Sequence, residues 1–392
     1  MTTPDRPYAL FSNGEMTRRH ERARRLMAEQ ELDALLISGD ENFQYFTGAN
    51  ASLAQHTSLT RPSVCILPRE GEPIVLTQGG SSLVLGSYIE DIRAYDGIVA
   101  FPVEDVVSAL HDASTNLRRI GVELGQEQRM GLPVADYLSL VERMRGVTFT
   151  DAAQLIIGLR MVKSAEELFY MRSAADITGR ARQRLFDEVH AGMTERDVSR
   201  RMRQLMLEEG ADASAFVILQ LDKPGAGCPY HYERPIERGE VLAIDAGAYV
   251  GMYTIDYVRM ATLGPATDSQ KRTHAAVLEV TNKMVAALGP GLTCSELFQL
   301  GKEAILATGL DADSPARIGL GRMGHGQGLL ITEPPSVCAE DHTVLEPGLV
   351  ISTEPGVRDG DVQFVWEDVH VITENGSEQL TLEPPTLREL VL

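Results

Sequence analysis

The sequence lacks any long uninterrupted hydrophobic run. In its 392 residues no apolar stretch approaches the 18 or more residues that a membrane-spanning helix needs. The first 25 residues also lack an apolar core between a basic start and a cleavage site, which a secretory signal peptide requires. These absences predict a protein that neither spans a membrane nor carries an export signal.

The sequence has few cysteines, and they are far apart. None forms a CxxC pair, so the spacing indicates neither a zinc knuckle nor a disulfide framework. Chains without such a framework are typical of reducing compartments, and we expect a cytoplasmic location. The four positions are Cys65, Cys228, Cys294 and Cys338.

Positive charge is also scarce. Thirty-six lysines and arginines stand against 56 aspartates and glutamates, which gives a net charge of −20. A chain this acidic is repelled by nucleic acids and by anionic membranes, so neither is expected as a partner.

The length predicts two domains, and 43% apolar residues are enough for two cores. In the first 150 residues strand-like runs alternate with helical stretches, which indicates an α/β domain. An exposed, charged helix is predicted over 15–31. Strands are predicted over 32–38, 63–68, 73–78 and 118–124, the middle two as a hairpin. No internal repeat is evident.

The second half has a different pattern. Ser164 followed by Glu167 is typical of a capping box, and it predicts a long amphipathic helix over 164–190. Further helices are predicted over 194–209, 268–288 and 294–308, with strands over 241–264 and 350–373. Runs of strands beside runs of helices favour an α+β domain. We expect domains over 1–158 and 159–392.

Two aspartates lie in the strand-like segment 241–264. The midpoint between Asp245 and Asp256 falls between Val250 and Gly251. A two-residue hairpin loop there, with a positive φ at Gly251, would make the aspartates cross-strand partners with Cβ atoms about 4.5–5.5 Å apart. Two buried carboxylates that close repel each other, so they need a shared proton or a cation.

Two glutamates form a second pair of the same kind. The midpoint between Glu354 and Glu367 lies beside Gly360, so a hairpin centred there brings both carboxylates together. A loop formed by Asp359 and Gly360 would instead move the centre one residue earlier, and the sequence leaves both registers open.

A histidine completes the set of candidate ligands. His325 has a glycine on each side, which leaves its imidazole uncrowded and lets the backbone bend around it. Four carboxylates and one histidine suit Mn²⁺, Fe²⁺, Co²⁺ or Zn²⁺. Two such ions about 3.5–4 Å apart would offset the repulsion between the carboxylates and activate a water molecule.

Several segments resemble the creatinase/aminopeptidase P/prolidase superfamily of pita-bread metallopeptidases. DALLISGDENFQYFTG (33–48) resembles its N-terminal domain, and LRMVKSAEELFYMRSAADIT (159–178) resembles the first helix of its catalytic domain. The most specific matches are IDAGAYVGMYTIDYVR (244–259), GHGQGLLITEPP (324–335), LEPGLVISTEPGV (345–357) and VWEDVHVITENG (365–376). The resemblance implies an α+β pita-bread catalytic domain preceded by an α/β creatinase-like N-terminal domain.

The resemblance also implies a dinuclear metal centre, with manganese as the leading expectation for its two divalent ions. Asp256 and Glu367 would bridge both ions. Asp245 would complete one site, and His325 with Glu354 would complete the other. Many relatives are homodimers, so a homodimer is expected. The implied substrate is a short peptide or another small molecule.

The implied substrate contacts are less regular. His231 matches a histidine that donates a proton or contacts the substrate, with Glu354 as the second catalytic residue. Arg259 is a further candidate contact. Thr332 stands where the peptidases usually have a second histidine, and Val365 stands where many have an arginine. These two departures put Xaa-Pro recognition in question.

Three functions are therefore weighed. The first is hydrolysis of a peptide or amide C–N bond by a metal-activated water, in the manner of an Xaa-Pro aminopeptidase or dipeptidase. The second is chemistry on a small zwitterion, as in relatives that act on creatine, ectoine or dimethylsulfoniopropionate. The third is a binding module without activity. The complete ligand set favours the first over the third, and substrate assays separate the first from the second.

Overall fold

The computed structural model describes residues 6–49, 61–221, 233–310, 321–360 and 362–391. The chain divides into two compact units, Met1–Arg160 and Met161–Leu392. The boundary lies within one helix, α6 (Ala153–Met161), two residues after the position that the sequence predicts. Among the described residues no helix is long and apolar enough to cross a membrane.

A six-stranded mixed sheet forms the centre of unit 1. Its strands follow the order β4-β3-β2-β1-β5-β6. They are β1 (Ala34–Ile37), β2 (Val64–Pro68), β3 (Ile74–Gln78), β4 (Asp91–Tyr95), β5 (Arg119–Val122) and β6 (Thr148–Asp151). The predicted hairpin is confirmed, because β2 and β3 pair antiparallel. The parallel pairs β1–β5 and β5–β6 are typical of the predicted α/β class.

In the part of unit 1 that the structure describes, the helices are α1 (Asn13–Glu29), α2 (Asp40–Thr47), α4 (Val103–Ala113), α5 (Val134–Arg143) and α6, with a short 3₁₀ turn, η1, at Gly80–Leu83. The helix predicted over 15–31 is present as α1, but the expectation that it is exposed is wrong for one of its faces. Arg19 is buried there between the rings of Phe11 and Tyr45, and Glu15 neutralises its charge. The many charged residues of this helix therefore do not prevent one of its faces from being buried.

Four helices form the outer layers of unit 2: α7 (Ala165–Glu188), α8 (Glu195–Glu208), α9 (Asp268–Ala287) and α10 (Cys294–Ala307). Each starts with a complete capping box, including the predicted one at Ser164 and Glu167. The reciprocal hydrogen bonds satisfy two backbone donors that a helix N-terminus otherwise leaves unpaired. All four helices lie where the sequence predicts them, within two residues at each end.

Strands of unit 2 fill the space between the helix pairs. One sheet has the order β18-β10-β8-β7 with β9 added to β8, a second has the order β12-β11-β13-β16-β17, and β14 pairs with β15. The first sheet contains β7 (Ala213–Leu221), β8 (Val241–Val250), β9 (Tyr253–Thr254), β10 (Tyr257–Leu263) and β18 (Arg388–Leu390). The other strands are β11 (Arg322–Gly326), β12 (Glu333–Cys338), β13 (Val350–Thr353), β14 (Gly356–Asp359), β15 (Val362–Val365), β16 (Asp368–Thr373) and β17 (Gly376–Gln379).

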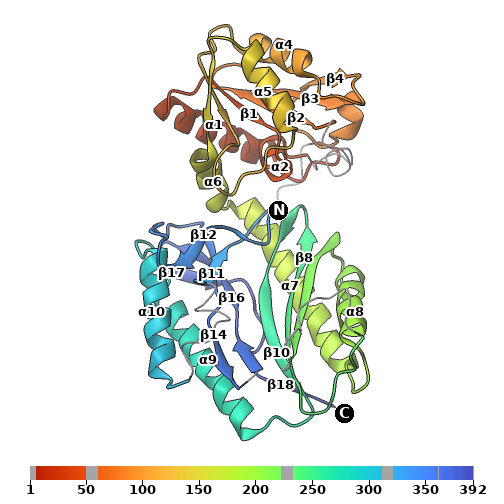
Figure 1. Ribbon diagram of the computed structural model, residues 1–392, viewed down its shortest axis with the longest axis vertical. Helices are drawn as coiled ribbons and strands as arrows, with labels where there is room; N and C mark the ends of the chain where they lie inside the picture. Colours follow the sequence, from red (N-terminus) through yellow and green to blue (C-terminus); the bar gives the residue numbers. More distant parts are fainter. Residues whose placement is uncertain (1–5, 50–60, 222–232, 311–320, 361, 392) are drawn as a thin grey trace. The chain divides into compact units, whose positions relative to one another are not determined.

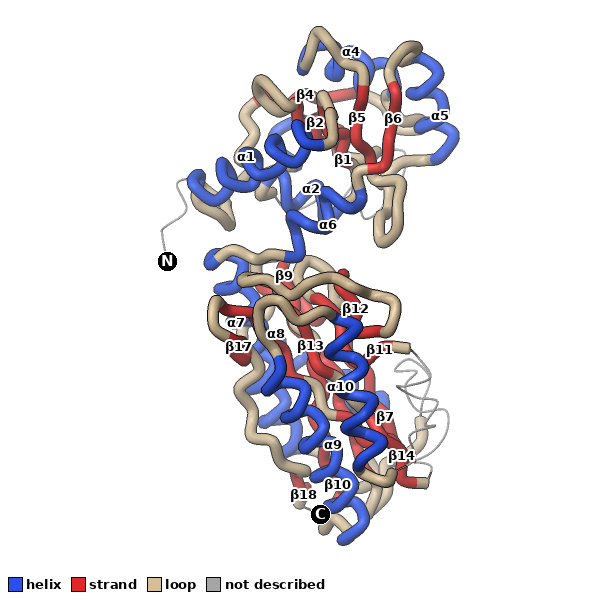
Figure 2. Tube along the Cα trace, turned by 90° about the vertical axis from the view of Figure 1, so that its left-hand side faces the viewer, coloured by secondary structure: helices blue, strands red, loops and turns tan. Residues whose placement is uncertain are grey.

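Helices cover the outer face of each set of strands. Residues of α7 and α8 share one hydrophobic core with one face of β7, β8 and β10. Residues of α9 and α10 share another with the second sheet, β14–β15 and the opposite face of β8 and β10. Figure 1 shows the two helix pairs on opposite sides of unit 2, and Figure 2 shows α9 and α10 running along one face. On β8, Val241 and Ala243 pack into the second core, and Asp245 continues the same face of the strand.

Unit 2 also contains an internal structural repeat, which is not evident from the sequence alone. Thr194 and Thr293 cap α8 and α10 in the same way, and each forms an isolated bridge to a later residue, Pro235 or Val344. The segments that follow, ERGEVLAID (237–245) and EPGLVISTE (346–354), are also alike. The repeat gives Asp245 and Glu354 equivalent positions.

Candidate functional site

Asp245 and Asp256 are close, but not as direct cross-strand partners. Asp245 lies in the middle of β8 opposite Val258, so the predicted register is wrong by two residues on the second strand. The loop is Gly251–Met252, and both residues have a positive φ, as a type I′ turn requires. Asp256 is therefore a diagonal neighbour of Asp245 on the same face, still within reach of its charge.

A break in the hairpin gives Asp256 its position. β9 ends at Thr254 and β10 begins at Tyr257, so the ladder is interrupted at Asp256. The carbonyl oxygen of Ile255 approaches Gly247 so closely that a Cβ there would lie 1.8 Å from it. A glycine is needed at this approach because any side chain would displace the bent strand.

Gln327 holds the backbone at this break, a role that its residue type alone does not reveal. Its side-chain oxygen accepts a hydrogen bond from the Asp256 amide, and its side-chain nitrogen donates to the Asp256 carbonyl, both at 2.8 Å. Gln327 is fully buried and thus replaces the strand partner that Asp256 lacks. Its place two residues after His325, in the motif GHGQG, is the signal that could have identified it.

Glu354 and Glu367 lie opposite each other, as predicted. β14 and β15 pair Asp359 with Val362, which places the hairpin centre beside Gly360 and excludes the alternative register. β13 and β16 continue the same register by pairing Thr353 with Asp368. Both glutamates stand in the short gap between these ladders, and both are buried.

His325 enters from β11, whose pairing with β12 is irregular on both sides of it. Gly324 has a φ of 145°, and a Cβ there would lie 2.0 Å from the Ser352 carbonyl oxygen. The predicted role of the flanking glycines in bending the backbone is thus confirmed. Nδ1 of His325 lies 3.0 Å from the Gly326 carbonyl oxygen, an arrangement that assigns the ring proton to Nδ1 and turns the Nε2 lone pair inward.

These residues converge in one buried cluster. Nε2 of His325 lies 3.5 Å from Oδ2 of Asp256 and 3.9 Å from Oε1 of Glu367. Ligand atoms of these three residues all lie within 4.8 Å of one another, a spacing that one metal ion can span. Burial, followed by the charges of Asp245 and Glu367 and also that of Glu354, raises the pKa of Asp256 well above its usual value.

The oxygen atoms of the cluster fit a cation. Oδ1 of Asp256 is buried and has no hydrogen-bond partner in the described part of the chain. Buried carboxylates are costly unless they are paired or coordinate a metal. Four carboxylates around one imidazole nitrogen therefore form a donor set suited to divalent metal ions.

Arg259 is not placed to contact a substrate, which corrects its predicted role. It is 2% exposed, and its guanidinium donates to the Glu367 carbonyl oxygen at 2.6 Å and to Asp368 Oδ1 at 2.7 Å. The ring of Trp366 lies 4.1 Å from it. These contacts hold the Glu367 segment against β10, so Arg259 supports the site from behind.

Two predicted substrate contacts remain, His231 and Thr332, together with Val365, which departs from the family pattern. His231 lies outside the described residues. Thr332 is half-buried next to Glu333, whose carboxylate forms a buried ion pair with Lys163 at 3.5 Å. That pair fixes the end of the segment that begins at His325, and the sequence did not reveal it. Val365 is buried on β15.

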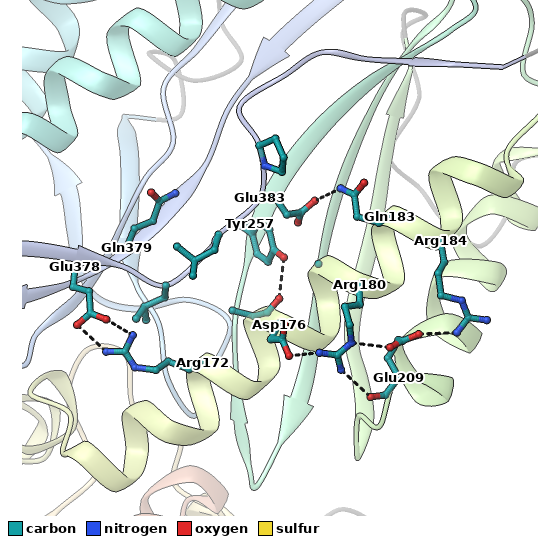
Figure 3. Close-up of a pocket in the computed structure, with 15 residues that line it drawn as sticks. Arg172, Asp176, Arg180, Gln183, Arg184, Glu209, Tyr257, Glu378, Gln379 and Glu383 are labelled. Carbon is teal, nitrogen blue, oxygen red and sulfur yellow. Dashed lines mark hydrogen bonds and ion pairs between the residues drawn. The ribbon is translucent and has the colours of Figure 1, made fainter.

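A separate cavity lies on the outer surface of unit 2. It measures about 870 Å³ and lies between α7, Tyr257 and the segment 378–384 (Figure 3). Its arginines are paired, for example Arg172 with Glu378 and Arg180 with Glu209, and no member of the carboxylate cluster lines it. This cavity is therefore separate from the candidate metal ligands.

Comparison with protein families gives two matches that together cover most of the chain. The model of metallopeptidase family M24 matches residues 170–374, which include every candidate metal ligand. The creatinase/prolidase N-terminal domain matches residues 19–162. The two matched segments correspond to the two units of the structure, and the pita-bread fold expected for unit 2 is confirmed.

Individual relatives match over nearly the whole length. The Xaa-Pro dipeptidase of Pyrococcus horikoshii is 27% identical over 375 residues, 93% of this chain and 96% of the relative. The Xaa-Pro dipeptidase of Pyrococcus furiosus is 26% identical, over 96% of this chain and all of the relative. The solved structure of a prolidase from Pyrococcus horikoshii superposes with a TM-score of 0.77 at 26% identity, over 95% of this chain and all of that one.

Proposed function

The chain belongs to metallopeptidase family M24 and is a metal-dependent peptidase, and we propose that it hydrolyses Xaa-Pro dipeptides. The buried cluster of Asp256, His325 and Glu367 is the observation that carries the proposal. The two Pyrococcus relatives named as Xaa-Pro dipeptidases supply the substrate class.

In this proposal the cluster would hold two divalent cations, manganese first among them. Asp256 and Glu367 would be ligands shared by both, Asp245 would serve one site, and His325 with Glu354 would serve the other. The charges support this arrangement, because four carboxylates balance two divalent ions. Support also comes from the repeat, which gives each site one carboxylate from an equivalent strand, Asp245 or Glu354.

Bound at such a centre, divalent cations lower the pKa of water and polarise the scissile carbonyl group. Side chains of the protein then transfer the protons and bind the substrate. Glu354 takes the proton of the attacking water and delivers it to the leaving nitrogen. His231 and Thr332 are proposed to contact the substrate near the carbonyl oxygen.

A substrate panel tests this proposal. Protein stripped of metal and reloaded with Mn²⁺ is offered Ala-Pro, Gly-Pro, Ala-Gly and the tripeptide Ala-Pro-Ala, beside creatine, ectoine and dimethylsulfoniopropionate. We expect hydrolysis of Ala-Pro and Gly-Pro, and little or none of Ala-Gly. Turnover of one of the small zwitterions without hydrolysis of either proline dipeptide would contradict the proposal.

We further propose that the enzyme is a cytoplasmic homodimer. The scattered cysteines, of which Cys65 and Cys294 are buried as free thiols, suit a reducing compartment. The dimer rests on the resemblance to prolidases. Light scattering on the purified, metal-loaded protein tests it, and a monomer mass across micromolar concentrations would exclude it.

A further inference from the structure

Pairs of residues follow one another along the inner face of the β13–β16 and β14–β15 ladders. Glu354 lies opposite Glu367, and because both ladders share one register, the alternation of side chains continues through the gap. Toward the hairpin turn at Gly360, the next pair on this face is Gly356 and Val365. The pair after that is Arg358 and Gln363. Side chains at every second position share a face, so these three pairs lie on the same face.

The face on which Arg358 lies follows from its neighbours. The carboxylate of Asp359, the next residue, accepts hydrogen bonds from Ser269 and Thr273 of α9. Val357, the preceding residue, is buried in the core that α9 shares with the strands. Both therefore point toward α9, and Arg358 points the other way, toward the face that carries Glu354 and Glu367.

Arg358 has no partner of its own in the described part of the chain. No ion pair or side-chain hydrogen bond of its guanidinium occurs among those residues, although Nε is buried. By contrast, the fully buried arginines of unit 2 have carboxylate partners, Arg182 with Glu383 at 2.6 Å and Arg259 with Asp368 at 2.7 Å. Since no described residue neutralises this half-buried arginine, its guanidinium is available for an anion that arrives with a ligand.

The distance suits a short substrate. Four residues of strand separate Arg358 from Glu354, about 13 Å between their Cα atoms at the usual rise of 3.3 Å per residue. The pair between them is Gly356 and Val365, and Gly356 has no side chain to block the path. An arginine side chain extended along this face points toward the carboxylate cluster and leaves room for a short substrate between them.

We propose that Arg358 binds the C-terminal carboxylate of the dipeptide, an inference that rests on the proposed function. Two divalent cations would balance the four cluster carboxylates, so the substrate carboxylate needs a further positive charge. The guanidinium provides this charge with paired donors that match a carboxylate. Arg358 also lies diagonally across from Val365, where the family resemblance leads one to expect an arginine, so the facing strand supplies the missing cation.

The test compares Ala-Pro with Ala-Pro amide, which lacks the carboxylate charge. Wild-type protein, Arg358→Gln, Arg358→Lys and the control Arg172→Gln are loaded with Mn²⁺, and KM and kcat are measured for both substrates. Arg172 is a matched control because it is an arginine on the outer surface, paired with Glu378. Circular dichroism and metal content verify that each variant is folded and loaded.

We expect Arg358→Gln to raise KM for Ala-Pro about ten- to hundredfold, the range for a lost hydrogen bond to a charged group. KM for the amide should change less than threefold, Arg358→Lys should be intermediate, and Arg172→Gln should behave as wild type. The double variant Arg358→Val/Val365→Arg should recover the preference for the free carboxylate. Calorimetric titration with L-proline should show the same order of affinities without turnover.

Two failures are distinguishable. Wild-type protein that hydrolyses neither Ala-Pro nor its amide would overturn the proposed function, and this inference with it. Wild-type hydrolysis of Ala-Pro combined with an unchanged KM in Arg358→Gln, or with equal losses for both substrates, would overturn the inference alone.

Discussion

At the scale of the residue, the site depends on groups that hold the carboxylates as much as on the carboxylates themselves. Gln327 binds both backbone groups of Asp256, and Arg259 binds the carbonyl of Glu367. The two bridging residues of the proposed centre are thus fastened by their main chains. Their side chains remain directed to the cluster at small cost in entropy when metal binds.

Replacing Gln327 with Ala should weaken the site without removing a ligand. The buried amide and carbonyl of Asp256 would lose their partners, which should cost about 2–4 kcal/mol in the free energy of unfolding. The affinity for Mn²⁺ should fall as well, because Asp256 would no longer be fixed. Urea unfolding of the metal-free protein and calorimetric titration with Mn²⁺ measure the two effects. Gln299→Ala, an exposed glutamine of α10, is the control, and equal behaviour of the two variants would refute the role of Gln327.

Residue types alone predict the candidate metal ligands, but not the residues that hold the backbone of those ligands in place. Carboxylates and a histidine in apolar, glycine-rich segments indicate metal chemistry, whereas a glutamine or an arginine in the same segments has many uses. The sequence offers Arg259 as a candidate substrate contact, because its charge alone does not reveal which groups it binds in the fold. In the structure Asp368 neutralises its charge, and its guanidinium also donates hydrogen bonds to backbone carbonyl oxygens.

At the scale of the element, glycines decide how closely the strands approach. At Gly324, the strand β11 passes Ser352 of β13 with no room for a Cβ atom. That approach gives His325 its hydrogen bond from the backbone amide to the Ser352 hydroxyl at 3.1 Å. The position of the imidazole is therefore set by the spacing of two strands.

Gly324→Ala should separate these strands. Overpacking and the unfavourable φ together should cost about 2–4 kcal/mol. Gly309→Ala is the matched control, because Gly309 also has a positive φ but nothing lies within 4 Å of the added carbon. We expect the control to lose about 1 kcal/mol and to retain its metal affinity. Equal losses of stability and metal affinity in both variants would show that crowding at Gly324 is unimportant.

The contact of α9 with the site strands should give the protein a pH dependence. His274 of α9 packs edge-on against Trp366, and burial, with a smaller effect of Arg259, lowers its pKa from 6.5 to about 4. The folded state therefore favours the neutral imidazole. Its contribution to stability is complete above pH 6.5 and is lost as the pH falls toward 4.

Urea unfolding of metal-free protein at several pH values measures this loss. His274→Phe should remove up to about 3 kcal/mol of the decrease between pH 7 and 4 while keeping the aromatic contact. His190→Gln, at an exposed histidine, is the control. An acid dependence unchanged by His274→Phe would assign the effect to other groups.

Of the two hairpin registers predicted from the sequence, one is correct and the other is not. The centre beside Gly360 was predicted correctly because the two ladders around Glu354 and Glu367 keep one register. The centre near Gly251 was misplaced because Met252 also adopts a positive φ, a conformation that its residue type does not suggest. The break at Asp256 depends on Gln327, which is 71 residues away in the chain.

At the scale of the whole molecule, the division into two units and the two fold classes could be predicted from alternating and segregated elements. The internal repeat of unit 2 could not, because few identities remain between its halves. The halves share a capping box on one helix, an isolated bridge from the capping threonine, and a carboxylate at the corresponding position of a similar strand segment. The repeat explains why two pairs of carboxylates from distant segments face one another.

The central claim is that this cluster binds the metal ions on which peptide hydrolysis depends. It is tested most directly by measuring bound manganese with mass spectrometry and Ala-Pro hydrolysis on the same samples of wild type, Asp256→Ala and the surface control Glu378→Gln. We predict two manganese ions per chain and full activity in wild type and control. Asp256→Ala should lose metal and at least about 10³-fold in activity together, the scale of a lost metal-centred catalytic contribution. Undiminished hydrolysis by an Asp256→Ala protein that contains no metal would contradict the account.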